Sequence, residues 1–167
     1  MNKFWHIIDI IAQFFMRIIL KILHIEWTSD QWMSFLQFVK FAIIGVTNTA
    51  VSYIINVIVL LIMEPLCVSW DYIVANCIAF VLSVLWSFYW NNKYVFKKEE
   101  GQYRSLWKSL LKTYASYAVS GIVIANILSW FLISILGVSK YIVPLINLVI
   151  SVPLNFILNK LWAFKTK

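Results

Sequence analysis

Four long apolar stretches dominate the chain, and charged or turn-forming residues separate them. They run over Phe41–Met63, Tyr72–Tyr89, Tyr114–Leu136 and Tyr141–Trp162. A helix of roughly 20 residues crosses the hydrocarbon core of a bilayer, and the backbone groups of a segment in lipid need partners within that segment. Each stretch is therefore a predicted transmembrane helix. The pattern predicts an all-α integral membrane protein with four transmembrane helices in a bundle.

The segment before the first span has a different period. Polar residues recur every three or four positions, which places one polar stripe on a helix whose other surface is Ile, Phe, Leu and Trp. Such a helix lies in the membrane interface rather than across the membrane. We expect an amphipathic interfacial helix over residues 1–28, with Ser29 or Asp30 as the N-cap of the next helix. The stripe consists of His6, Asp9, Gln13, Arg17, Lys21 and His24.

Composition and charge agree with a membrane protein and indicate its orientation. The chain is 62% hydrophobic and 13% charged, and its mean hydropathy is +0.83, which excludes an ordinary soluble domain. The net charge of +7 does not indicate nucleic-acid binding, because no stretch forms a soluble domain. Basic residues gather in the connection between the second and third spans and near both termini, so the positive-inside rule places these parts in the cytoplasm. The connection carries Lys93, Lys97, Lys98, Arg104, Lys108 and Lys112.

Residues suited to catalysis or metal binding are scarce. Cys67 is expected in an outer loop and Cys77 inside the second span, which gives neither a disulfide nor a metal site. Glu99 and Glu100 are the acidic residues of the cytoplasmic connection, and no span has a carboxylate in its interior. General acid–base chemistry and metal sites depend on such groups. We expect no enzyme, no metal and no cofactor.

The chain ends its second and fourth spans in nearly the same way. "SFYWNNKYVF" at Ser87–Phe96 aligns with "NFILNKLWAF" at Asn155–Phe164, so that Asn91 corresponds to Asn159 and Phe96 to Phe164. The repetition indicates two helical hairpins, over residues 29–99 and 100–167. Since each hairpin has an even number of spans, the two form a parallel repeat whose endings reach the same, cytoplasmic, surface.

Polar residues inside the spans fall on helix faces. Such residues prefer the interior of a bundle or a wet cavity, where they hold helices together or bind a ligand. We favour ligand binding for Asn91, Asn159, Lys93 and Lys160, because several donors converge at one depth; snorkelling of the lysines to headgroups is the alternative. The stripes are Gly45, Asn48, Thr49, Ser52 and Asn56 in the first span, Ser83, Ser87 and Asn91 in the second, and Asn147, Ser151, Asn155 and Asn159 in the fourth.

Two segments together resemble a known family. "FVKFAIIGVTNT" from Phe38 and "NFILNKLWAF" from Asn155 are similar to the signatures of the GtrA-like family of small membrane proteins, and the resemblance covers residues 38–164. Members of that family are tied to cell-surface polysaccharide glycosylation, in which they move or handle a polyprenyl-phosphate-linked sugar. The signature residues are Phe38, Gly45, Asn48, Thr49, Asn155, Phe156, Asn159, Lys160, Trp162 and Phe164.

The resemblance implies a function in the bacterial cell membrane: translocation or handling of a polyprenyl-phosphate-linked sugar for glycosylation of a polysaccharide or teichoic acid. A non-transporting scaffold for a polyprenyl-phosphate glycosyltransferase and a small-molecule exporter remain alternatives. A glycosyltransferase, membrane lipid and a second copy of the chain are the expected partners. The lipid phosphate and sugar are expected to contact Asn155, Asn159, Lys160, Asn91, Lys93, Asn48 and Trp162.

Overall fold

The computed structural model describes residues 3–66, 71–98, 101–139 and 142–165, and most of these are helical, with no strand among them. The predicted all-α class is confirmed. Cys67, Glu99, Glu100 and Tyr141, to which the sequence analysis assigns positions, lie outside the described residues. The elements are α1 (Lys3–Leu23), α2 (Ser29–Met63), η1 (Glu64–Leu66), α3 (Asp71–Trp90), η2 (Asn91–Val95), α4 (Leu106–Ala118), η3 (Val119–Ile124), α5 (Ala125–Trp130), η4 (Phe131–Ile135), α6 (Val143–Leu158) and η5 (Asn159–Ala163).

Three helices of the described chain are long and apolar enough to cross a membrane: Ser29–Leu66, Ile73–Val95 and Ile146–Ala163. The predicted span at Tyr114–Leu136 falls in the helix that runs from α4 to η4 without a break. Its second half, Asn126–Ile135, is a shorter apolar helix. The protein is therefore a multi-pass membrane protein.

The start of α2 differs from the expected one. Thr28 is the N-cap, and its Oγ1 accepts a hydrogen bond from the backbone N–H of Gln31. The Gln31 Oε1 in turn accepts from the backbone N–H of Thr28 at 2.8 Å. This reciprocal pair is a capping box, which depends on a Thr and a Gln three residues apart. The prediction of Ser29 or Asp30 as the cap was wrong, because both already lie within the first turn.

The amphipathic helix α1 packs against α2 and exposes a second apolar face. Trp5 and Leu20 are buried, and the Lys40 Nζ of α2 lies 2.8 Å from the Asp9 Oδ2 of α1. The polar stripe borders this contact, and the opposite face is apolar and exposed. Such a helix can pack on the protein with one face and meet lipid with another. The exposed apolar residues include Phe4, Ile7, Ile11, Phe14, Phe15, Ile18 and Ile22.

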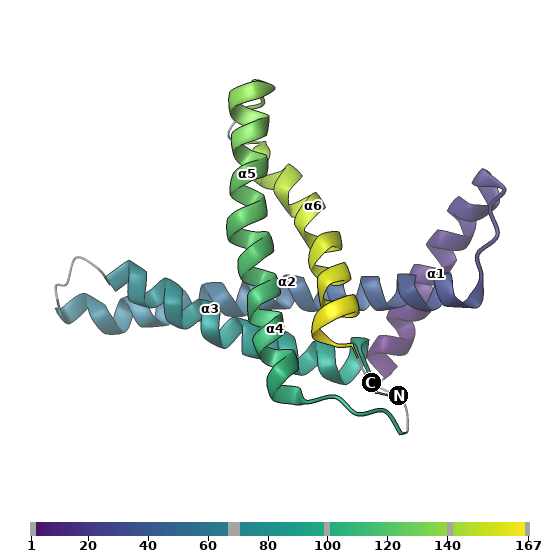
Figure 1. The fold of residues 1–167 in the computed structure, drawn as a ribbon, viewed down its shortest axis with the longest axis horizontal. Coiled ribbons are helices and arrows are strands. Elements are labelled where there is room, and N and C mark those ends of the chain that lie inside the picture. The colour runs from purple at the N-terminus through teal and green to yellow at the C-terminus, as the bar shows by residue number, and fades with distance from the viewer. Residues whose placement is uncertain (1–2, 67–70, 99–100, 140–141, 166–167) are drawn as a thin grey trace.

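The remaining helices form two hairpins that cross. One consists of α2 and α3, and the other of the α4–α5 helix and α6 (Figure 1). The outer tips of the two hairpins point in different directions (Figure 1). One core cluster joins the hairpins to α1 where the two repeated segments end. Its buried members are Trp5, Phe41, Ile44, Val95, Phe96, Phe156, Ala163 and Phe164.

Candidate functional site

The two repeated segments, Ser87–Phe96 and Asn155–Phe164, which we call the first and second endings, pack against each other. The Phe88 ring stacks on Phe164 with centroids 5.4 Å apart, and the Phe156 ring stacks on Phe96 at 5.9 Å. These two contacts are equivalent in the alignment of the endings. Each ending also finishes as a π-helical turn, in which the N–H of the last Phe donates to the carbonyl of Asn91 or Asn159 at 2.8 Å.

Asn91 and Asn159 are completely enclosed in these endings, with exposed fractions of 1% and 0%. The Asn91 Nδ2 donates to the Ser87 Oγ at 3.1 Å, and the Asn159 Nδ2 donates to the Asn155 carbonyl at 2.8 Å. Their Oδ1 atoms are buried and have no partner in the part of the chain that the structure describes. The structure thus directs both amide donors along their own helices, where they stabilise the endings.

Arg104, which the sequence analysis did not single out, joins the two endings. Its Nη1 donates to the Phe164 carbonyl and its Nη2 to the Phe96 carbonyl, each at 2.9 Å. Nη2 also contacts the Asn92 Oδ1, and the guanidinium lies 4.9 Å from the Phe164 ring centroid.

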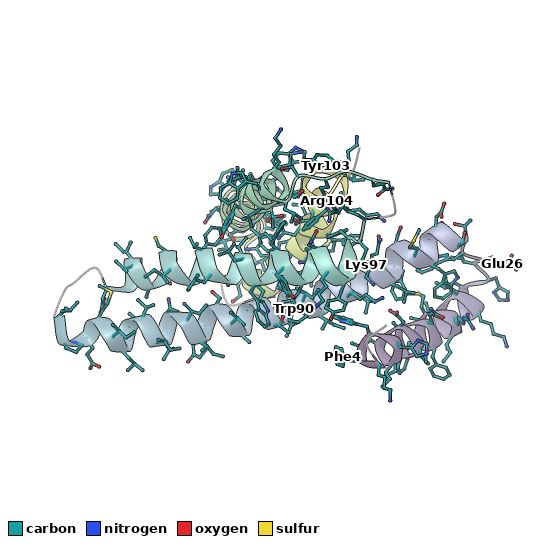
Figure 2. All side chains as sticks on the ribbon, turned by 90° about the horizontal axis from the view of Figure 1, so that it is seen from below. Phe4, Glu26, Trp90, Lys97, Tyr103 and Arg104 are labelled. Carbon is teal, nitrogen blue, oxygen red and sulfur yellow. The ribbon has the colours of Figure 1, made fainter. Side chains whose placement is uncertain are left out.

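The guanidinium of Arg104 suits this buried position, because its five donors lie in one plane and reach both carbonyls. Burial lowers the pKa of Arg104, although a guanidinium keeps its charge at neutral pH. Figure 2 shows Arg104 on the side of the second hairpin and Phe4 of α1 on the other side of the first hairpin.

The sequence offered one signal for the role of Arg104: it is the one arginine in a connection whose other basic residues are lysines.

The predicted lysines have different surroundings. The Lys160 Nζ donates to the Ser34 Oγ of α2 at 2.7 Å and lies 5.6 Å from the Phe156 ring centroid. The Lys93 Nζ donates to the Tyr89 hydroxyl at 3.3 Å. Neither lysine is paired with a carboxylate in the part of the chain that the structure describes. The Lys93 Nζ also lies 5.4, 5.6 and 5.5 Å from the ring centroids of Tyr89, Trp90 and Tyr94.

Trp162 is partly exposed and belongs to a third arrangement. The Lys112 Nζ donates to the Trp162 carbonyl at 3.3 Å and lies 5.5 Å from its ring. The lysines and Trp162 are therefore spread over the surface around the endings, each with its own neighbour.

A cavity of about 810 Å³ lies where α2, α4 and α6 meet, and it brings two predicted site residues together. Asn48 comes from α2 and Asn155 from α6, and both line this cavity. Their polar stripes thus face the same space, as residues that avoid lipid are expected to do. The lining consists of Phe41, Ala42, Gly45, Val46, Asn48, Thr49, Ala50, Tyr53, Tyr117, Leu148, Ser151, Val152 and Asn155.

Hydrogen bonds behind the cavity wall fix part of this lining. The Ser120 Oγ donates to the Asn155 Oδ1 at 2.6 Å, and the Tyr117 hydroxyl lies 2.8 Å from the Ser87 Oγ. The Asn48 Oδ1 is buried and has no hydrogen-bond partner among the residues with described positions. Tyr117 and Ser120 were missed by the sequence analysis, since their role depends on contacts between helices.

The other face of α2 borders a smaller, aromatic cavity of about 280 Å³. Thr47 lines it, and the Trp86 Nε1 donates to the Thr47 Oγ1 at 3.2 Å. Thr47 and Asn48, which are adjacent in α2, therefore line different cavities.

Among the residues with described positions, no three His, Cys, Asp or Glu side chains form a group that could hold a metal ion.

The chain is similar to one protein family and to three curated relatives, all of them cell wall teichoic acid glycosylation proteins of Listeria. A family model described as "GtrA/DPMS, transmembrane domain" matches residues 40–164. The cell wall teichoic acid glycosylation protein GtcA of Listeria monocytogenes is 30% identical over 146 residues, which cover 86% of this chain and 92% of the relative. GtcA of Listeria innocua serovar 6a is 31% identical over 102 residues, which cover 59% of this chain and 68% of the relative. No solved structure matches the chain significantly.

Proposed function

The chain belongs to the GtrA/DPMS transmembrane-domain family, and from that premise we propose that it moves or handles a polyprenyl-phosphate-linked sugar in the bacterial membrane. The proposed purpose is glycosylation of a cell-surface polymer. The names of the Listeria relatives, which specify teichoic acid glycosylation, favour a cell wall polymer as the acceptor.

One observation carries the proposal: the same helical segment carries a cation with no carboxylate partner among the described residues and one wall of a cavity that contains uncharged polar side chains. Lys160 follows Asn155 by five positions, which corresponds to about 7.5 Å along a helix axis. A lipid phosphate requires a cation and hydrogen-bond donors, and Lys160 with the Ser34 hydroxyl supplies both. The prenyl chain then lies against the exposed apolar side chains of the hairpins.

The proposed topology has four spans in two parallel hairpins, with both termini and the connection in the cytoplasm. Equivalent ring contacts between the endings support the repeat, and the lysines and Arg104 of the connection support the orientation. The phosphate is then held at the cytoplasmic boundary.

The proposed role is not catalytic, and a polyprenyl-phosphate glycosyltransferase is the proposed partner that performs the chemistry. No carboxylate lines the cavity at Asn155, and sugar transfer commonly uses one as a base. A second copy of the chain is a further proposed partner, because four helices enclose little space.

The decisive experiment compares Lys160→Ala, Lys160→Arg and Lys108→Ala. A charge-assisted hydrogen bond contributes about 1.5–3 kcal/mol, so Lys160→Ala should weaken lipid binding roughly 10- to 150-fold. Lys160→Arg should retain much of the binding, because the charge remains. Lys108 is an exposed basic residue of α4, and its replacement should have little effect.

The measurements are binding of a polyprenyl-phosphate sugar to purified protein in nanodiscs and surface glycosylation in cells. Wild-type binding by a well-expressed Lys160→Ala variant would contradict the phosphate site. Co-purification of a glycosyltransferase with a wild-type protein that binds no such lipid would instead favour the scaffold.

A further inference from the structure

The cavity between α2, α4 and α6 has a largely apolar lining that contains six uncharged polar side chains. Its polar members are two carboxamides, two aliphatic hydroxyls and two phenols: Asn48, Asn155, Thr49, Ser151, Tyr53 and Tyr117. Its other members are apolar, and none carries a charge. A volume of about 810 Å³ lies within the range of roughly 300–1,000 Å³ that is usual for small-molecule sites.

The hydrogen-bonding groups of this lining are only partly used within the protein. The Asn48 Oδ1 has no partner among the described residues, but the protein itself encloses this atom. The Asn155 Oδ1 is occupied by the Ser120 hydroxyl, which leaves the amide group of Asn155 as a donor. The Thr49 hydroxyl donates to the Gly45 carbonyl at 3.2 Å and keeps its own lone pairs. The cavity thus offers acceptors and donors together.

We infer that this cavity binds the uncharged sugar of the lipid, separately from the phosphate. This inference rests on the proposed function and specifies the substrate class. Sugar hydroxyls both donate and accept, so they pair with the lone pairs of the Thr49 hydroxyl and with the free donor of Asn155. Leaving such groups unpaired in a buried site costs free energy, which favours a ligand that pairs them.

Charged sugars fit the same cavity poorly. A uronic acid brings a carboxylate, which accepts but does not donate, and the lining has no cation to pair with it. An amino sugar brings an ammonium, and the lining has no carboxylate. Moving either charge out of water without a partner is expensive. The lining therefore selects a neutral hexose or N-acetylhexosamine.

Phe156 contacts both the phosphate site and the lining of the sugar cavity. The Lys160 Nζ lies 5.6 Å from the Phe156 ring centroid. Phe156 also contacts Phe41, which lines the cavity, with centroids 5.6 Å apart. The two ligand groups thus have separate neighbours, so their contributions to binding can be measured separately.

The test uses purified protein in nanodiscs and three lipids: polyprenyl phosphate, polyprenyl-phosphate-glucose and polyprenyl-phosphate-galacturonic acid. The wild type should bind the glucose lipid more tightly than the other two. Asn48→Leu should reduce this preference about 3- to 10-fold, as expected for one hydrogen bond, and should leave binding of the bare lipid unchanged.

A matched pair of isosteric changes controls for folding. Thr49→Val removes a hydroxyl inside the cavity, and Thr47→Val removes one two positions away that borders the aromatic cavity. The first should lower the preference for the glucose lipid, and the second should not.

The outcomes separate the two proposals. Equal binding of all three lipids by the wild type, or an unchanged preference in Asn48→Leu and Thr49→Val, would overturn the sugar cavity and leave the phosphate site standing. Failure of the wild type to bind any of the lipids would overturn both.

Discussion

Phe96 and Phe164, the last residues of the two endings, stack on each other with ring centroids 4.6 Å apart and planes inclined by 24°. They occupy matching positions in the two endings, so each ending uses the other as its packing partner. Both rings are nearly buried, with exposed fractions of 6% and 4%. The Phe that ends each repeat therefore forms one half of the contact that joins the two hairpins.

Removing one of these rings should destabilise the junction. Phe164→Ala is expected to cost about 3–5 kcal/mol of unfolding free energy, as is usual for a buried Phe. The exposed Leu161 provides the control, since Leu161→Ala should cost far less. The free energies would be measured by reversible unfolding in mixed micelles.

The two rings should also be coupled. The Phe96→Ala/Phe164→Ala double variant should lose less than the sum of the single variants, by about 0.5–1.5 kcal/mol. Strict additivity would show that the stacking contributes nothing beyond burial.

Arg104 should be replaceable neither by lysine nor by an apolar side chain. Arg104→Met leaves the Phe96 and Phe164 carbonyls without the donors that they have now, at about 1–3 kcal/mol for each buried group. Arg104→Lys retains the charge but lacks the planar fork that reaches both carbonyls. Both variants should lower the unfolding temperature in nanodiscs and speed proteolysis of the connection. A wild-type profile for Arg104→Lys would show that only the charge matters.

The Asp9–Lys40 ion pair should hold α1 against α2. Its side chains are only 15% and 18% exposed, and breaking the pair is expected to release α1 at a cost of about 1–3 kcal/mol. Asp9→Lys and Lys40→Asp should each raise the labelling of a cysteine placed at Leu20, which is buried in the folded protein. The double reversal should restore protection; if it does not, the packing of Trp5 rather than the ion pair holds the helix.

The proposed orientation places Cys67 outside the cell. A thiol reagent that cannot cross membranes should label Cys67 in intact cells. Cys77 should stay unlabelled although its side chain is exposed, because it lies in the candidate span Ile73–Val95 and a thiol facing lipid does not form the reactive thiolate. Labelling of Cys67 only after lysis would reverse the topology.

The helices, the amphipathic character of α1 and the repeated endings were all available from the sequence. Each depends on local properties: the length of an apolar run, a period of three to four residues, or a recurring set of letters. The cap of α2 was also local, yet the Thr28–Gln31 pair that decides it was overlooked in favour of its neighbours.

The depth of each polar side chain was decided only by the tertiary structure. Asn91 and Asn155 look equivalent in sequence as polar members of a stripe, but Asn91 is enclosed in an ending while Asn155 lines a cavity with Asn48. Arg104 resembles its neighbouring lysines until the folded chain brings the Phe96 and Phe164 carbonyls to it. Periodicity fixes the helix face on which a residue lies, whereas burial and partners depend on which distant segment packs against that face.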